Sequence, residues 1–238
     1  RSGRTTDGDW VMVHHAGVLT DYCPGEFVDS AAVDSSHQHN CYWARRTLGL
    51  VKGAGAPAYV WPVDDINKAN DWREFWWTLN TSPSNTIELA GDHAAIVGGR
   101  HGHRLDVHFA LPDPAEYPKP HTLVLAQDEM AGGSPNYIDQ RTEAQKPAYV
   151  ENPERMLFHS VHVRPRLIAK VAGYNGRFMA VMNPRRKGAA PVGFERLPTL
   201  GNALAVRLTF PAVTDTLIYA YEHNLLEAGD IVGRGQWC

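Results

Sequence analysis

Leu105-Asp106-Val107-His108-Phe109-Ala110-Leu111 is the stretch that decides the fold. Its large apolar side chains fall on every second residue, and Leu204-Ala205-Val206-Arg207-Leu208-Thr209-Phe210 repeats the pattern. Alternation with a period of two is typical of a half-buried β-strand, whereas an amphipathic helix repeats roughly every 3.6 residues. Both stretches are therefore predicted to be strands.

Further short apolar runs continue this pattern along the chain, and no stretch carries a sustained helical stripe. The runs cover residues 10–15, 42–51, 59–63, 72–79, 86–89, 94–97, 122–126, 157–163, 167–171, 178–182 and 216–221. Turn residues separate them, and Tyr174-Asn175-Gly176-Arg177 is the strongest hairpin signal. The predicted fold is all-β: a large antiparallel two-sheet sandwich (a super-β-sandwich) with little helix, formed as one domain by residues 1–238.

Two segments interrupt the predicted strands. Residues 112–120 contain four prolines and are expected to form an extended surface connector. Residues 127–152 are polar and contain Gly132-Gly133, Pro135 and Pro147, which predicts a long loop. A loop of this length in a compact domain is usually functional or mobile.

Composition excludes several classes of function. The 238 residues are 43% hydrophobic and 21% charged, as expected for a soluble globular protein. The formal charge of 23 minus 26, or −3, argues against a general nucleic-acid-binding surface. No apolar run approaches the roughly 18 residues of a membrane span, and the start has no signal-peptide pattern. Because the chain opens at Arg1 and stops at Gln236-Trp237-Cys238, we expect it to be a portion of a longer protein.

The first candidate site lies in Asp34-Ser35-Ser36-His37-Gln38-His39-Asn40. In an extended segment His37 and His39 point the same way, so they could converge on one ion or one acidic group. Asp21 would lie near them if the strands that flank this segment pair. The alternative is two solvated loop histidines. Cys23 and Cys41 flank the segment, and the sequence leaves open whether they form a disulfide or remain thiols.

The second candidate site lies in the aromatic run Trp72-Arg73-Glu74-Phe75-Trp76-Trp77. On a strand, Phe75, Trp77 and Leu79 share one face, which we assign to the core. Trp72 and Trp76 share the other face and could form a platform for sugar rings, since indole faces offer apolar contact. A strand buried on both faces would explain the same residues.

The remaining polar clusters carry weaker signals. Arg164 and Arg166 straddle Pro165 and share a face, where they could contact a carboxylate or sulfate or simply be surface charge. His101-Gly102-His103 is predicted to be a turn with solvated histidines. The sequence contains no Ser-His-Asp motif, phosphate-binding glycine loop or cysteine-type zinc motif.

The order of features resembles the C-terminal β-sandwich domain of heparinase II/III-like polysaccharide lyases. Asp7-Gly8-Asp9-Trp10 resembles the opening turn of that domain, and residues 11–13 resemble the strand that follows it. Gly17, Val18-Leu19-Thr20-Asp21 and Gly25 then lead to His39-Asn40, which resembles the end of the family's histidine-containing loop.

Later strands extend the resemblance over most of the chain. Trp76-Trp77-Thr78-Leu79-Asn80 resembles the family's Trp-Leu-Leu-His strand, and residues 177–184 resemble its Phe-x-x-Val-Leu-x-Pro strand. The departures are Arg4-Thr5-Thr6, where the family usually has histidines before the aspartate, and Phe27, where it has a tyrosine. The α/α-toroid that precedes the sandwich in such lyases is missing from this sequence.

The resemblance implies β-elimination on a uronic-acid-containing polysaccharide. Such lyases remove the C5 proton beside the carboxylate and then expel the oxygen at C4, which requires a base and a group that neutralises the carboxylate. It implies catalytic roles for His39 and Asn40, with His37 beside them, and the substrate-binding candidates remain Trp72, Trp76 and Arg164, which were singled out from the residues above. It also implies a possible structural zinc or calcium ion at Asp21 and His39. The expected partners are an acidic polysaccharide and the missing N-terminal domain, and the expected location is secreted or periplasmic.

Two other functions fit the residues. The first is a non-catalytic carbohydrate-binding or structural β-sandwich, in which Trp72 and Trp76 would contact sugar. The second is a glycoside hydrolase, which needs two carboxylates that flank one cleft. Glu74, Asp106 and Glu129 are available, but no spacing singles out a pair.

Overall fold

The computed structural model of the chain describes residues 2–4, 10–12, 18–23, 28–34, 42–52, 57–68, 70–110, 123–132, 162–199, 203–221, 225–228 and 231–234. Within these ranges there are eighteen strands and no helix. The strands are β1 Ser2–Arg4, β2 Trp10–Met12, β3 Val18–Cys23, β4 Val28–Asp34, β5 Trp43–Val51, β6 Tyr59–Asn67, β7 Arg73–Asn80, β8 Thr86–Ala90, β9 His93–Val97, β10 Arg104–Ala110, β11 Val124–Gly132, β12 His162–Gly173, β13 Gly176–Arg185, β14 Gly193–Leu197, β15 Ala203–Thr209, β16 Thr214–Ala220, β17 Leu225–Ala228 and β18 Ile231–Arg234.

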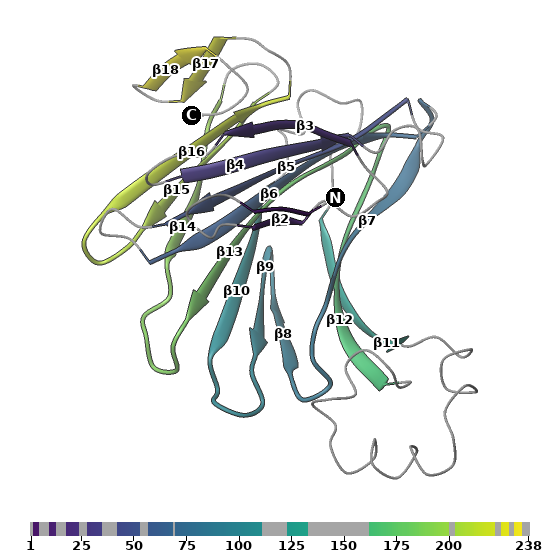
Figure 1. Cartoon of the computed structure of the whole chain (residues 1–238), viewed down its shortest axis with the longest axis vertical. Coiled ribbons are helices and arrows are strands. Elements are labelled where there is room, and N and C mark those ends of the chain that lie inside the picture. The colour runs from purple at the N-terminus through teal and green to yellow at the C-terminus, as the bar shows by residue number, and fades with distance from the viewer. Residues whose placement is uncertain are drawn as a thin grey trace.

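A large central sheet organises the fold (Figure 1). Its eight strands follow the order β3-β4-β5-β6-β13-β10-β9-β8, and each neighbouring pair is antiparallel. Three-stranded sheets of order β14-β15-β16 and β11-β12-β7 accompany it. The antiparallel, all-β sandwich predicted from the sequence is therefore confirmed.

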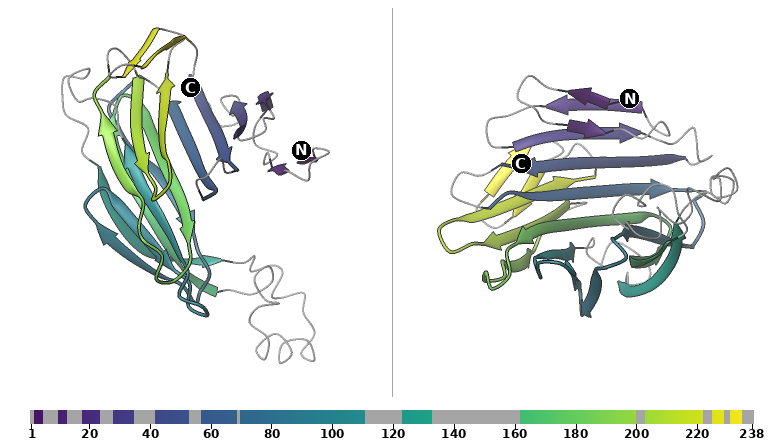
Figure 2. Two further views of the ribbon diagram at one scale, coloured as in Figure 1. Left: turned by 90° about the vertical axis from the view of Figure 1, so that its left-hand side faces the viewer. Right: turned by 60° about the horizontal axis from the view of Figure 1, so that its bottom comes forward.

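Strand β13 shows how the three sheets form layers (Figure 2). Met179 and Val181 pack with residues of β15 and β16, in what we call the first core. Phe178 and Ala180, which alternate with them, pack with residues of β7 and β12 in the second core. Because successive side chains of a strand point to opposite faces, the central sheet is covered on one face by β14-β15-β16 and on the other by β11-β12-β7. A strand buried on both faces reads as a continuous apolar run, as Phe178–Met182 does.

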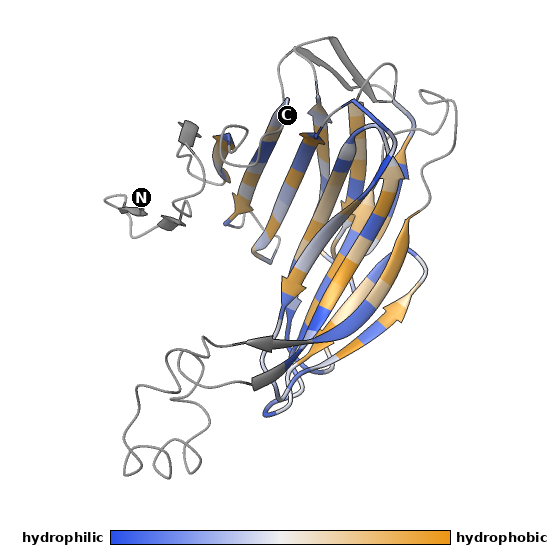
Figure 3. Ribbon diagram, turned by 90° about the vertical axis from the view of Figure 1, so that its right-hand side faces the viewer, coloured by the Kyte–Doolittle hydropathy of each residue, from blue (hydrophilic) through white to orange (hydrophobic). Residues whose placement is uncertain are grey.

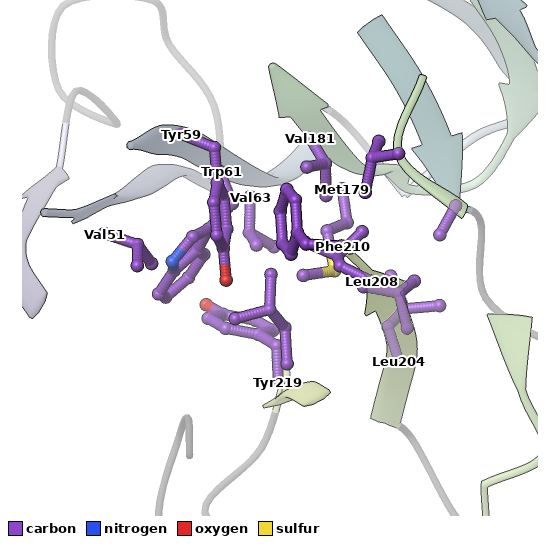
Figure 4. Close-up of a cluster of buried hydrophobic side chains, with 14 of the residues drawn as sticks. Val51, Tyr59, Trp61, Val63, Met179, Val181, Leu204, Leu208, Phe210 and Tyr219 are labelled. Atoms are coloured by element: carbon purple, nitrogen blue, oxygen red, sulfur yellow. The ribbon is translucent and has the colours of Figure 1, made fainter. Parts of the chain in front are cut away.

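The first core contains a large aromatic group (Figure 4). Tyr59 of β6 is 1% exposed and stacks on Phe210 with ring centres 5.7 Å apart. Its hydroxyl donates a 2.9 Å hydrogen bond to Asp215, at the start of β16. Burial of the phenol, together with the nearby Asp215 carboxylate, raises the pKa of Tyr59 far above its ordinary value. This hydrogen bond ties the small sheet to the centre of the large one.

A buried ionic network occupies β10 and β13 on the first-core face. Asp106 is 3% exposed and lies opposite Asn183 in the register of these strands. Arg185 donates to both carboxylate oxygens of Asp106, and the Arg104 guanidinium lies 3.7 Å from the same carboxylate. Arg104 in turn donates a 2.5 Å hydrogen bond to Glu88 on β8. The network satisfies the buried charge, as a low-dielectric interior requires.

The structure corrects some sequence-based boundaries. Residues 127–132 were expected to begin a loop but continue strand β11 to Gly132, paired with β12 as far as His162. Strands β4 and β14 were not predicted, because Val28–Asp34 and Gly193–Leu197 carry little regular apolar alternation. The hairpin predicted at Asn175-Gly176 is wrong: a turn is present there between β12 and β13, but the two strands belong to different sheets and do not pair. The proline-rich segment 112–120 lies outside the described residues, as do residues 133–152 of the predicted loop.

The described part of the chain contains no helix that is long and apolar enough to cross a membrane.

Candidate carbohydrate-binding surface

Strand β7 separates its aromatic side chains onto two faces. Phe75 and Trp77 are 8% and 5% exposed and belong to the second core, where Trp77 packs edge-on against Phe109 with ring centres 5.2 Å apart. Trp76 points to the other face and is 50% exposed. The prediction that Phe75 and Trp77 are core residues is confirmed. The alternative, a strand buried on both faces, is wrong because the Trp76 side chain is half exposed.

Trp76 is held in place by charged neighbours on this outward side of the β11-β12-β7 sheet, which we call the outer face. Figure 3 views the molecule from the side on which this sheet lies. Lys170 of β12 is the cross-strand partner of Trp76, and its ammonium nitrogen lies 4.1 Å from the centre of the indole ring. The indole N–H donates a hydrogen bond to Glu74, two residues earlier on the same face. A cation over an indole face is attracted by the ring quadrupole, by about 0.5–1 kcal/mol at an exposed site.

An ion pair continues the outer face beyond Lys170. Arg166 of β12 lies opposite Asp128 of β11 and donates to both of its carboxylate oxygens, with an Nε to Oδ1 distance of 2.8 Å. This hydrogen bonding lowers the pKa of Asp128, and the positive charges of Arg166 and Lys170 act in the same direction. Asp128 is thus fixed as an anion and Arg166 as a cation. Along β12, Arg166 and Lys170 lie on one face because they are an even number of residues apart.

Trp72 lies just before β7 and forms an aromatic pair with Tyr174. The rings are 5.5 Å apart at an interplanar angle of 88°, and the residues are 38% and 39% exposed. The turns that carry them are joined by a 2.7 Å hydrogen bond from the Asn67 side chain to that of Asn175. The side-chain oxygen of Asn67 also accepts a hydrogen bond from the backbone N–H of Asn70. Asn70 has a positive φ of 52°, in the turn between β6 and β7. The hydrogen bonds of Asn67 therefore stabilise the two turns that carry Trp72 and Tyr174.

Arg164 lies on β12 opposite Met130, and the register places it on the outer face with Arg166, as the sequence predicted. It borders a pocket at the end of the sheet, together with Asn80 and Thr81. Lys170 is a residue that the sequence analysis missed. Its only signal would have been the pairing of β7 with β12, which lie about ninety residues apart in the chain.

The histidine site falls outside the described residues. His37, His39 and Asn40 lie between the end of β4 and the start of β5, in a stretch for which no placement is described. The backbone of Asp21 is described: it belongs to β3, which pairs antiparallel with β4, and it directly follows a register shift at Leu19/Asp21. Such β-bulges are frequent beside active sites. Asp21 was expected near the histidines if its strand paired with the strand that follows them, but β4 lies between β3 and β5, so those two strands do not pair.

The metal and disulfide predictions also remain predictions. Among the side chains that the structure describes, no three His, Cys, Asp or Glu residues form a group suited to a metal ion. The side chains of Asp21 and Cys23 are not described, and His39 and Cys41 lie outside the described ranges. The Asp21–His39 zinc or calcium site and the Cys23–Cys41 bridge are therefore untested.

Two of the carboxylates considered for a glycoside hydrolase, Glu74 and Asp106, do not form a pair. Asp106 is buried on the first-core face of the central sheet and is engaged by Arg185. Glu74 lies on the outer face of the β11-β12-β7 sheet, which covers the opposite side of the central sheet. Glu129 is exposed at the far strand, β11. Since a central sheet separates Glu74 from Asp106, they cannot flank one glycosidic bond.

Comparison with solved structures identifies a similar fold. The chain is similar to a mutant of heparan sulfate lyase HepC from Pedobacter heparinus, with a TM-score of 0.57 and 12% sequence identity. The match covers 87% of this chain but 28% of the lyase, so the present chain spans less than a third of that enzyme. No protein-family profile matches the sequence. No curated protein sequence matches it either. At this identity the likeness shows a heparinase-like fold, and activity has to be argued from the residues.

Proposed function

We propose that this domain binds an acidic polysaccharide on its outer face, as the β-sandwich portion of a polysaccharide lyase. The observation that carries the proposal is the ammonium group of Lys170 above the exposed ring of Trp76. A uronic-acid residue combines an apolar C–H face with a carboxylate. The pair Trp76 and Lys170 offers a complementary surface for each of these two parts.

The arrangement suggests how such a sugar would bind. An incoming carboxylate draws Lys170 from its position above the indole into an ion pair and opens the ring face to the sugar's C–H groups. The cost is the weak attraction between cation and ring, about 0.5–1 kcal/mol, which an ion pair with stacking offsets. Arg164, further along β12, supplies positive charge for the next unit, while Arg166 is paired with Asp128, and Trp72 with Tyr174 supplies apolar contact at the other end of β7.

The catalytic part of the proposal rests on residues of the β4–β5 connection. Asn40 would donate a hydrogen bond to the substrate carboxylate and so increase the acidity of the C5 proton, and His39, with His37 beside it, would accept that proton. The alternative role of His39 is as a ligand, with Asp21, of a structural divalent metal, because a metal-bound imidazole has no nitrogen left to accept the proton. The similarity of the fold to part of heparan sulfate lyase HepC supports the lyase proposal. The remaining wall of the cleft would come from an N-terminal domain, and the location would be outside the cytoplasm.

Calorimetric titration of the 238-residue chain with a panel of polymers tests the binding claim. We expect heat and saturation with heparin, alginate or chondroitin sulfate, none with neutral dextran, and weaker binding as salt concentration rises. Equal binding of neutral and acidic polymers would contradict the role of Lys170.

A non-catalytic carbohydrate-binding domain is the second candidate, because the outer face alone would support it. Incubation of the polymers with the longer protein that contains this domain, and with its His39→Ala variant, separates the two. A lyase releases unsaturated uronic-acid ends that absorb ultraviolet light, and the variant should not. If the longer protein binds polymer but releases no such ends, the binding function stands and the lyase proposal fails.

A further inference from the structure

We propose that the chain has a second binding site, for a phosphate monoester, on two neighbouring turns at one end of the central sheet. The turns join β9 to β10 and β13 to β14, and they lie side by side because β10 pairs with β13 as far as Arg104 and Arg185. Both turns are in the lower part of the molecule in Figure 1. The site uses none of the outer-face residues, and the proposal does not depend on polysaccharide binding.

The two turns form a cationic surface. Residues 98–105 and 184–194 contain neither aspartate nor glutamate, and they contain the cations Arg100, Arg104, Arg185, Arg186 and Lys187. The chain as a whole has a formal charge of −3, so positive charge is concentrated here against the average of the molecule. Charge of one sign gathered on one surface attracts ligands of the opposite sign.

Two of the five cations are available to a ligand. Arg104 and Arg185 are paired with carboxylates of the buried ionic network described above. Arg100 already has a partner. Arg186 and Lys187 are exposed, and in the described part of the chain no carboxylate pairs with either of them. A ligand anion would therefore be bound by Arg186 and Lys187.

Lys187 is held against the β9–β10 turn. A Cβ on Gly102 would lie 3.2 Å from Cδ of Lys187, so the aliphatic part of the lysine runs past the residue between His101 and His103. Gly102 also has a positive φ of 64°, which residues with a side chain rarely adopt. Glycine at this position thus lets the turn form and leaves room for the lysine, which brings the two turns into contact.

The two histidines supply further hydrogen-bond donors. Their rings are exposed and their centres are 5.7 Å apart. The backbone N–H of Lys187 donates to Nδ1 of His103 at 3.3 Å, so the neutral imidazole of His103 carries its hydrogen on Nε2 and can donate it to an anion. His101 and His103 are solvated turn residues, as the sequence predicted, and they border the cations of the second turn.

Backbone hydrogen bonds fix both turns before a ligand binds. The N–H of Gly98 donates to the carbonyl of His103 at 2.8 Å, and the N–H of Gly102 donates to the carbonyl of Gly98 at 2.9 Å. In the second turn the N–H of Ala189 donates to the carbonyl of Arg186 at 3.1 Å. Turns that are already ordered lose little conformational freedom on binding, which favours affinity.

The available donors select the class of ligand. A phosphate monoester has three acceptor oxygens and roughly 1.5–2 negative charges near pH 7. It can use the Lys187 ammonium, the Arg186 guanidinium and the His103 N–H together. A carboxylate has two oxygens and one charge, and a sulfate ester has one charge, so both should bind more weakly. The phosphate can belong to a sugar or to a lipid headgroup.

Nitrogen-15 NMR of the 238-residue chain with glucose 6-phosphate tests this site, and glucose, glucose 6-sulfate and glucuronate are the matched controls. We expect glucose 6-phosphate to shift the backbone resonances of Gly102, His103 and Gly188, and glucose to leave them unchanged. Glucose 6-phosphate should bind about threefold more tightly than glucose 6-sulfate or glucuronate, because its second charge adds an exposed ion pair.

The double variant Arg186→Gln with Lys187→Gln keeps the backbone hydrogen bonds of both turns and should bind glucose 6-phosphate about tenfold more weakly. Arg196→Gln with Arg207→Gln removes the same charge from β14 and β15 and should have no effect.

Vesicles of phosphatidylcholine with phosphatidic acid distinguish the two sources of phosphate. The chain sediments with them if the ligand is a lipid headgroup and stays in solution if it is a soluble phosphorylated sugar, and either result supports a phosphate site once glucose 6-phosphate shifts the turn resonances. The proposal is overturned if glucose 6-phosphate does not shift them, if glucose 6-sulfate or glucuronate binds equally well, or if the double variant keeps wild-type affinity. Because the four sugars are compared on the unmodified chain, a poorly folded variant does not remove the test.

Discussion

Gly176 and Phe75 lie so close that a Cβ on Gly176 would be 2.5 Å from Cγ of Phe75. Gly176 begins β13 in the central sheet, and Phe75 belongs to β7 in the covering sheet. The glycine of the Asn-Gly turn, which joins strands of two different sheets, is therefore needed for close packing between the two layers. Its φ is not positive, and neither Tyr174 nor Asn175 has a positive φ, so the turn is not of the type that the Asn-Gly pair predicts.

Gly176→Ala should lower the free energy of unfolding by about 1–3 kcal/mol, because the new methyl group overpacks the second core. Urea denaturation measures this value. In the double variant Gly176→Ala with Phe75→Leu the two losses should not add, since leucine makes room for the methyl group. Strict additivity would show that the Gly176–Phe75 contact is not the cause.

Asp106→Ala should destabilise the chain by about 3–5 kcal/mol, because it leaves Arg185 and Arg104 without their buried carboxylate. Asp128→Ala, which breaks the exposed pair with Arg166, should leave the melting temperature nearly unchanged. Thermal unfolding of both variants makes the comparison. Similar melting temperatures for the two variants would show that the Asp106 network is not a buried structural element.

His108 should make stability depend on pH. Its ring stacks on Phe194 of β14 at 4.8 Å and on His93 of β9 at 5.1 Å. Burial lowers the pKa of His108 below its ordinary value of 6.5, and the nearby His93 adds to this effect, while Asp106 and Asp92 oppose it. The unfolded chain therefore binds the proton more readily, so this contribution to stability is complete above pH 6.5 and is lost as the pH falls toward the folded-state pKa.

His108→Phe keeps the stack and removes the titration. As the pH is lowered from 7.5 toward about 5, the free energy of unfolding of the wild type should fall more than that of this variant. Denaturation at several pH values measures it, and the variant corrects for all other titrating groups. A difference that does not change with pH would contradict the account of His108.

The strands that the sequence predicted are those in which packing leaves a simple pattern. Leu105, Val107 and Phe109 alternate because β10 has one face in the second core, and the period of two is visible in the sequence. Strand β4 shows no such pattern, since Asp29 and Ser30 are buried polar residues beside Ala31. The two cores on opposite faces of β13 could not be predicted, because sheet order depends on contacts between distant segments.

For the binding surface, the sequence identified the aromatic residues but not their charged partner. The period of two predicted that Trp76 and Trp77 lie on opposite faces of the same strand, which the structure confirms. It could not show that Lys170 lies over Trp76, because β7 and β12 are about ninety residues apart and their pairing forms only in the fold. The pocket was missed for the same reason: Leu79, Ile96 and Leu105 come from three strands and meet only in the fold.

Binding of heparin oligosaccharide by the Trp76→Ala and Lys170→Gln variants tests the central claim most directly. Both side chains lie on the outer face and Trp76 is half exposed, so the melting temperature should stay within a few degrees of that of the wild type. We predict that calorimetry will show at least about a tenfold loss of affinity in each variant, and that their double variant will lose little more, because the two residues act on one sugar. Wild-type affinity in both single variants would contradict the assignment of the outer face as the polysaccharide-binding surface.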